Sequence, residues 1–323
     1  MCYAPTAWPP KKIEYFGDNV IGEMMNLDPE YIEAWRDKVA GFTGFIYWFN
    51  TQCPMGLNVH MTARETAERL RYLHENGFVG LGLDSEGIWG LQGRVFYMAG
   101  RLMGDPSLDY RDIIEEYCNG VYGKAGGTMT KFFDLLEARL QEVIPIDKDD
   151  ISVERRRTRM PRWLNTADMY LVQYPPSFLQ QLEQLLQKAQ SEADTQRTQG
   201  WVRLSRDQFD FTRLLTEMLI SYRAWQVNPT EANWLELKGA VDVFEDYRLK
   251  IVTYPKEYTD LWWPGHGTFC KWLTANTEDT GVAFYIPWET RKAVVMKRGI
   301  RGMGMGYELF NITEPLTLDF GAH

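Results

Sequence analysis

The N-terminal third of the chain alternates short apolar segments with helical ones, and this alternation limits the fold more than any other feature. Helical patterns occur at 28–40, 62–77 and 93–104. They are separated by apolar segments that suit buried strands: NVIGEMM (19–25), GFTGFIYWFN (41–50) and the run from Phe78 to Leu83. A strand, helix, strand order with short connections is typical of a parallel α/β unit. Three such units are too few for an eight-stranded barrel, which takes about 250 residues. This pattern therefore predicts either a small open sheet or part of a larger barrel.

Local signals mark where several helices begin and end. Thr62 is a predicted N-cap with Glu65 three residues later, and Gly77 follows the end of that helix. Asp109 and Gly123 bracket the next predicted helix in the same way. These signals predict helices over 62–77 and 109–123.

From residue 105 onward the strand signal disappears and helical periodicity continues to about residue 253. A polar, charged connector (147–162) interrupts the helices, which are predicted over 109–123, 126–144, 176–195, 200–226 and 229–252. The apolar stripes of these helices favour a bundle core. After residue 254 we expect only short strands, at 281–288, 292–299 and 314–321.

The composition excludes several classes of function. The chain has 323 residues and a net charge of −9, which argues against a nucleic-acid surface. No stretch approaches the roughly 20 apolar residues of a membrane span, and the N-terminus lacks the pattern of a signal peptide, so a cytoplasmic location is expected for the chain as given. Four scattered cysteines predict neither a zinc site nor a disulfide framework. The histidines have no metal-ligand spacing, and the GxGxG spacing within 299–308 lacks a convincing strand and helix around it, so we expect no metal and no cofactor.

Polar and aromatic residues follow the second and third predicted strands. In parallel α/β barrels the loops after the strands build the active site. Carboxylates bind sugar hydroxyls, and indole rings stack on the apolar faces of sugars. The candidate substrate-binding residues are therefore Tyr47, Trp48, Asn50, Asp84, Glu86 and Trp89. Glu23, at the end of the first strand, is a further acid expected on that rim.

The segment from Gly41 to Leu140 resembles the domain of unknown function 4838 family. The resemblance is carried by GFIYWFNTQ, ARETAERLRYLHENGFVGLGLDSEG and AGRLMGDPSLDYRDIIEEYCNGVYGKAGGTMTKFFDLLE. It implies the latter part of a barrel of the hexosaminidase and α-glucuronidase kind, followed by a helical domain. By the same analogy Glu86 and Trp89 hold a sugar, and the catalytic acids lie on a strand before Met1. The chain departs from the family at Asn50, where no acid follows the second strand, and at Gly104, where relatives tend to have Trp.

Taken together, these observations predict α/β plus all-α architecture. Its parts are the C-terminal portion of a (β/α)8-type barrel (1–104), a helical bundle domain (105–253) and a short β tail (254–323). The predicted function is glycoside hydrolase-like binding of an oligosaccharide or polysaccharide, and whether the chain is an enzyme stays open. The alternative is a non-catalytic module that binds carbohydrate or another protein through its helical half.

Overall fold

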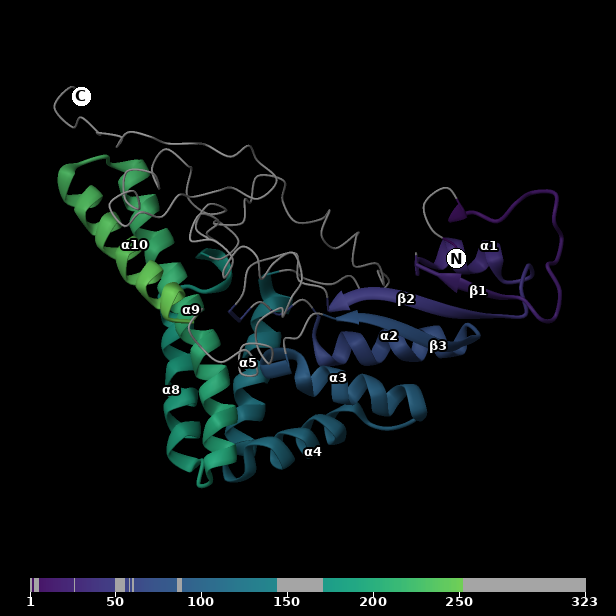
Figure 1. Ribbon diagram of the computed structural model, residues 1–323, viewed down its shortest axis with the longest axis horizontal. Helices are drawn as coiled ribbons and strands as arrows, with labels where there is room; N and C mark the ends of the chain where they lie inside the picture. Colours follow the sequence, from purple (N-terminus) through teal and green to yellow (C-terminus); the bar gives the residue numbers. More distant parts are fainter. Residues whose placement is uncertain are drawn as a thin grey trace. The chain divides into compact units, whose positions relative to one another are not determined.

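A computed structural model describes residue 2 and residues 6–25, 27–49, 56–57, 59, 61–85, 89–143 and 171–251 (Figure 1). These residues form two compact units. Unit 1 holds the sheet, most of the helix that follows it and the next helices up to residue 143. Unit 2 holds residues 56–57, residues 89–91 and the helices from residue 171 onward.

Unit 1 contains a three-stranded parallel sheet in the order β1-β2-β3. Its strands are β1 (Ile21–Met24), β2 (Gly41–Phe49) and β3 (Phe78–Ser85). The middle strand pairs with both neighbours, so consecutive strands lie side by side as the alternating pattern predicts. β3 extends two residues beyond the predicted end at Leu83.

The connecting helices are α1 (Pro29–Trp35), α2 (Ala63–Glu75) and α3 (Trp89–Gly104). The predicted cap of α2 is confirmed, because the Thr62 side chain accepts a hydrogen bond from the Glu65 backbone N–H. The chain then turns at Gly77, whose φ of +84° suits a residue without Cβ. α3 begins four residues before the predicted start at residue 93.

Two further helices belong to unit 1: α4 (Tyr110–Tyr122) and α5 (Gly126–Val143), joined by the 3-10 turn η2 (Gly123–Ala125). Asp109 caps α4 as predicted, accepting from the backbone N–H of Arg111. The predicted apolar stripe of α5 is buried and consists of Met129, Phe132, Phe133, Leu136 and Leu140.

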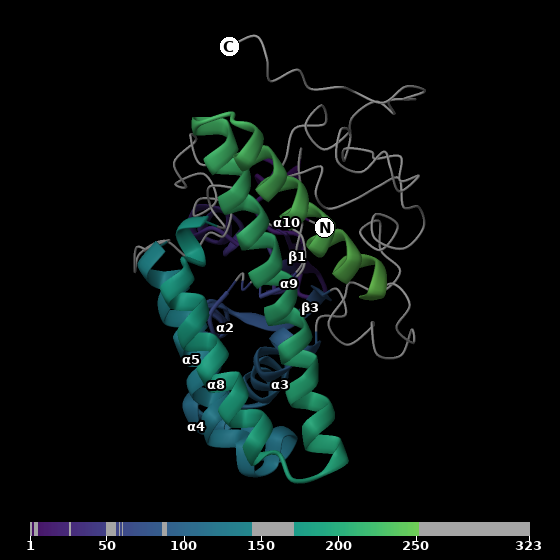
Figure 2. The same ribbon diagram turned by 90° about the vertical axis from the view of Figure 1, so that its left-hand side faces the viewer.

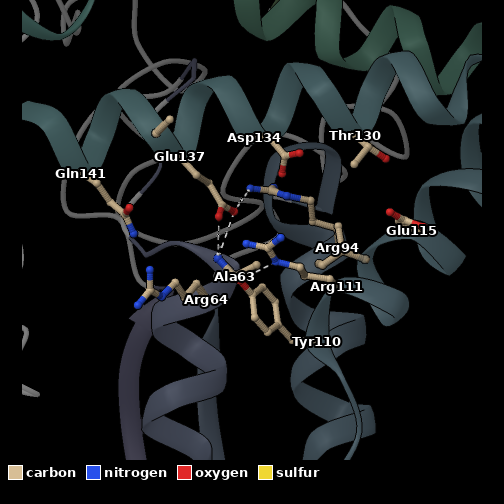
Figure 3. A pocket seen from close by; sticks show the side chains of 12 residues that line it. Ala63, Arg64, Arg94, Tyr110, Arg111, Glu115, Thr130, Asp134, Glu137 and Gln141 are labelled. Atoms are coloured by element: carbon tan, nitrogen blue, oxygen red, sulfur yellow. Dashed lines mark hydrogen bonds and ion pairs between the residues drawn. The ribbon is translucent and has the colours of Figure 1, made fainter. Parts of the chain in front are cut away.

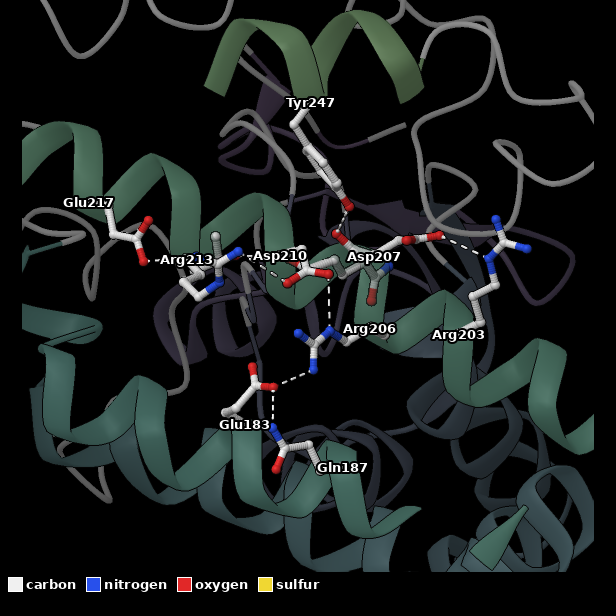
Figure 4. Close-up of polar contacts among 11 residues, drawn as sticks. Glu183, Gln187, Arg203, Arg206, Asp207, Asp210, Arg213, Glu217 and Tyr247 are labelled. Carbon is white, nitrogen blue, oxygen red and sulfur yellow. Dashed lines mark hydrogen bonds and ion pairs between the residues drawn. The ribbon is translucent and has the colours of Figure 1, made fainter. Parts of the chain in front are cut away.

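Unit 2 contains three long helices, α8 (Pro176–Glu192), α9 (Gln196–Val227) and α10 (Glu231–Ile251), which lie side by side (Figure 2). Thr195 caps α9 together with Thr198. The apolar stripes predicted for α9 and α10 are buried at Phe211, Leu215 and Phe244, and the rings of Phe211 and Phe244 meet edge to face. Charged side chains cross-link α8 and α9 at their polar edge (Figure 4).

The structure therefore confirms a mixed α/β chain with a small parallel sheet and a predominance of helices. The barrel, the independent helical bundle and the β tail stay predictions; the expected strands at 281–288, 292–299 and 314–321 lie outside the described residues. α4 and α5 belong to the same compact unit as the sheet. The predicted domain boundary after residue 104 would instead assign them to a separate helical domain. None of the helices described here combines the length and apolar character needed to cross a membrane.

Candidate functional site

The ends of β2 and β3 lie beside each other in the sheet. Ile46 pairs with Leu83 and, after an irregularity in the register, Phe49 pairs with Ser85. Tyr47 and Trp48 therefore belong to the last three residues of β2. They lie next to the part of β3 that contains Asp84. The backbone thus brings two of the three predicted polar stretches to one edge of the sheet.

The six predicted site residues differ in how far the structure describes them. Tyr47, Trp48 and Asp84 are described as strand backbone, and Trp89 is the first residue of α3 rather than part of a loop. Asn50 and Glu86 lie outside the described residues. The prediction that the six side chains share one site therefore stays a prediction.

Glu23 is not at this edge, which corrects one expectation. Its strand is short, and Glu23 pairs with Thr43 near the beginning of β2. Five residues separate Thr43 from Trp48, which corresponds to about 16 Å along an extended strand. The sequence gives the order of the strands but not their register, so the end of β1 was wrongly aligned with the ends of its neighbours.

A pocket of about 320 Å³ lies within unit 1, next to the first turn of α2 (Figure 3). Because α2 follows β2 and leads back to β3, this turn lies on the side of the sheet where β2 ends. The pocket is polar, and its charged lining residues come from four helices: Arg64, Arg94, Arg111, Glu115, Asp134 and Glu137.

A buried ion pair forms one wall of the pocket. Arg94 Nη2 donates to Glu137 Oε1 at 2.5 Å, and the Arg94 side chain is 1% exposed. The guanidinium also lies over the ring of Phe133, 4.2 Å from its centroid. Both oxygens of the Glu137 carboxylate also accept from the backbone N–H of Ala63, each at 3.0 Å. Glu137 thus joins α5 to α3 and satisfies a free N–H at the start of α2.

Burial governs the ionisation of the carboxylates on α5. It raises the pKa of Glu137, while Arg94 and the Ala63 N–H act in the opposite direction. Burial also raises the pKa of Asp134, opposed by Arg94 and Arg111 and reinforced by the negative charge of Glu115. Asp134 is therefore in the field of two guanidinium groups and one carboxylate.

Two further arginines, Arg64 and Arg111, line the pocket. Arg64 Nε donates to Glu68 Oε1 at 2.8 Å, and Arg111 Nε donates to the hydroxyl of Tyr110 at 3.3 Å. The positive charge of Arg111 lowers the pKa of Arg64, although the hydrogen bond from Arg64 to Glu68 outweighs this effect and raises it overall.

Sequence reasoning missed this pocket. Glu137 follows Phe133 by four residues and so falls on the apolar stripe of its helix, which is the one local signal for a buried acid. Its partner Arg94 is 43 residues away and lies on another helix, so no spacing rule connects the two. Among the described residues, no group of three or more His, Cys, Asp or Glu side chains is placed to hold a metal ion.

Comparisons with family models, curated proteins and solved structures found no match for this chain. The resemblance to the domain of unknown function 4838 family therefore stays a prediction from the sequence.

Proposed function

We propose that this chain binds a glycan at the edge of the sheet where β2 and β3 end. The observation that supports this proposal is the pairing of Phe49 with Ser85, which makes neighbours of the aromatic stretch of β2 and the acidic stretch of β3. The indole of Trp48 would stack on the apolar face of a sugar ring. The carboxylate of Asp84 would accept hydrogen bonds from its hydroxyl groups.

The two neighbouring strand ends support glycan binding, whereas hydrolysis makes a further demand. Glycoside hydrolysis needs two carboxyl groups on opposite sides of the scissile bond. Asp84 belongs to the end of β3 and Glu86 follows that strand in the sequence, whereas Glu23 is displaced from this edge by the register of β1. Among the acids considered for this rim, Asp84 and Glu86 would then be the candidates for the acid and the base.

The proposal is tested by titrating the chain with a panel of oligosaccharides in a calorimeter. We expect Trp48→Ala and Asp84→Asn each to weaken binding by about tenfold or more, since each removes a direct contact. Trp8→Ala and Asp37→Asn are the matched controls, because Trp8 is an exposed indole of unit 1 and Asp37 an exposed acid away from the strand ends. They should leave the affinity unchanged.

Two results would overturn the proposal: no heat of binding with any glycan of the panel, or equal affinities for Trp48→Ala and the parent chain. The first result would favour a protein-interaction module instead. If aryl glycosides are cleaved, loss of turnover in Glu86→Gln with retained binding would assign that carboxyl a catalytic role.

A further inference from the structure

The formal charges that line the pocket beside α2 cancel. They belong to three arginines and three acids, which are Arg64, Arg94, Arg111, Glu115, Asp134 and Glu137. Two of the arginines are engaged in short ion pairs, Arg94 with Glu137 at 2.5 Å and Arg64 with Glu68 at 2.8 Å. A charged ligand would compete with these contacts and would meet a charge of its own sign in the lining. The balance of charge therefore favours a neutral ligand.

The lining nevertheless keeps hydrogen-bonding groups that the described part of the chain does not use. Asp134 and Gln141, both on α5, form no hydrogen bond with another described residue. The side chain of Arg111 on α4 donates from Nε to the Tyr110 hydroxyl at 3.3 Å and makes no other hydrogen bond within the described ranges. Figure 3 shows Asp134 and Gln141 extending from α5 on the side that faces the first residues of α2 and α4. Acceptors and donors are thus available around one shared space.

A molecule with several hydroxyl groups matches this combination. Each hydroxyl can donate to the Asp134 carboxylate or the Gln141 carbonyl, and it can accept from the Arg111 guanidinium. The hydrogen bonds to the two charged groups are the stronger ones. Because a hydroxyl carries no net charge, it can use these groups without replacing a partner in the ion pairs of the pocket.

The apolar surface and the size of the pocket restrict the ligand further. Ala63, Ile114 and Ala138 offer small apolar contacts, which suit the C–H groups of a ring. Among the described lining residues Tyr110 is the one aromatic, and the Arg111 guanidinium lies 5.9 Å from its ring centroid. A nucleobase would therefore find little aromatic surface on which to stack. A volume of about 320 Å³ is at the lower end of the range for ligand pockets and suits a single ring.

We propose that this pocket binds one neutral sugar ring, whose hydroxyl groups form hydrogen bonds with Asp134, Gln141 and Arg111. Two sources share this chemistry, a free monosaccharide and the terminal ring of a longer glycan. None of the pocket residues belongs to the site proposed at the strand ends. The inference therefore does not rest on that proposal, and either one can fail while the other stands.

The first test is calorimetric titration of the full chain with two matched sets of sugars: glucose, glucosamine and glucuronate, and galactose, galactosamine and galacturonate. Inorganic phosphate is the anion without a sugar ring. The titrations use the parent chain and Trp48→Ala, in which the site proposed at the strand ends is weakened. We expect at least one neutral sugar to bind both chains about fivefold or more tightly than its charged relatives and phosphate, because a charged group meets a like charge in the lining.

Variants of the lining locate the bound sugar. Asp134→Ala and Gln141→Ala should each weaken the binding of the neutral sugar about fivefold or more, since each removes a direct hydrogen bond. The matched controls are Asp112→Ala, at an exposed acid of α4, and Glu142→Ala, next to Gln141 on α5. Both control residues lie outside the pocket lining, so these variants should change the affinity less than about twofold. Circular dichroism checks that each variant is folded, and Asp134→Asn, which keeps the size of the side chain, replaces Asp134→Ala if the latter is unfolded.

An oligosaccharide separates the two sources of the sugar. A trisaccharide that ends in the bound sugar should match or exceed the affinity of the monosaccharide if the pocket holds the end of a glycan. It should bind more weakly if the pocket holds a free sugar, because the additional rings then find no room.

The inference is overturned if no neutral sugar binds, if phosphate or a charged relative binds as well as the best neutral sugar, or if Asp134→Ala and Asp112→Ala have equal effects. Binding that Trp48→Ala abolishes and Asp134→Ala leaves unchanged would also overturn it, while supporting the function proposed for the strand ends. Binding that is lost in Asp134→Ala but retained in Trp48→Ala would support the pocket and not the strand ends.

Discussion

The two compact units stabilise a partly or fully buried arginine in different ways. In unit 1, Arg94 donates to the carboxylate of Glu137 at 2.5 Å, and its side chain is 1% exposed. In unit 2, Arg206 on α9 donates to Glu183 on α8 at 2.6 Å and to Asp210 on its own helix at 3.0 Å, and its side chain is 22% exposed (Figure 4). Both guanidinium groups lie over a phenylalanine ring, Arg94 over Phe133 and Arg206 over Phe209. Arg94 is almost fully buried, whereas Arg206 is partly exposed and is shared between two acids.

The difference indicates different roles for the two arginines. Arg206, Glu183 and Asp210 keep 22%, 24% and 19% of their side-chain surface exposed, so water partly screens their charges and we expect a modest net contribution to stability. Arg94 and Glu137 carry a large desolvation cost that their mutual contact must offset. Such a pair is costly to break, and in this chain it lines a pocket and fixes the start of α2.

The largest effect on stability is expected from Glu137→Ala. This change removes the hydrogen-bonded carboxylate of the buried Arg94 and the acceptor of the Ala63 N–H. We expect the free energy of unfolding to fall by about 3–5 kcal/mol, measured by urea denaturation. Glu142→Ala, which removes an exposed partner of Arg139 from the same helix, is the control. Equal losses in both variants would show that Glu137 is not a buried anchor.

A smaller effect is expected from the ionisation of Tyr117, near the same pocket wall. Burial raises the pKa of Tyr117 to about 12, whereas a tyrosine in the unfolded chain ionises near its ordinary pKa of 10.0. Between these values the folded chain keeps a proton that the unfolded chain releases, so stability should fall as pH rises from 10 to 12. The expected loss is roughly 2 kcal/mol.

Comparison with Tyr117→Phe isolates this contribution, because the other tyrosines titrate in both proteins. The parent chain should lose more stability than Tyr117→Phe over this pH range, as followed by urea denaturation. Parallel pH profiles for the two proteins would contradict the burial of the Tyr117 hydroxyl.

The smallest of the three effects is expected from Arg206→Ala in unit 2. The two acids that lose their partner are partly exposed, so we expect a loss of about 1–2 kcal/mol. Glu217→Ala, which removes the outer partner of Arg213 further along α9, should cost less than about 0.5 kcal/mol. If Arg206→Ala destabilised the chain as much as Glu137→Ala, the contrast between the two units would be lost.

Local signals in the sequence were sufficient for most elements. The Thr62 and Asp109 caps lie where predicted, because a capping side chain acts on backbone groups two or three residues away. The start of α3 was missed because Gly90 is a poor helix former. A Cβ at this residue would lie 2.6 Å from Leu204 Cδ2, so close packing against α9 within unit 2 requires glycine there.

The two candidate sites also differ in how far local sequence signals predicted them. The strand-end residues were found because they follow strands that alternate with helices, and the parallel order of those strands is confirmed. The register of β1 against β2 was not predictable, because shifting a strand along its neighbour leaves its local sequence unchanged. Glu23 therefore lies away from the rim on which it was predicted. No local sequence pattern predicted the pocket at α2, because its lining residues come from four separate helices.

By itself, the sequence determined which segments are strands and helices, where several of them begin, and that consecutive strands run parallel. These properties depend on periodicity and on contacts within a few residues. Only the tertiary structure decided that Arg94, Glu137 and the N–H of Ala63 meet, and that Arg64 and Arg111 face a shared cavity with Asp134 and Glu115. Such meetings depend on how helices far apart in the chain pack, and packing follows from the whole set of buried surfaces rather than from any one stretch.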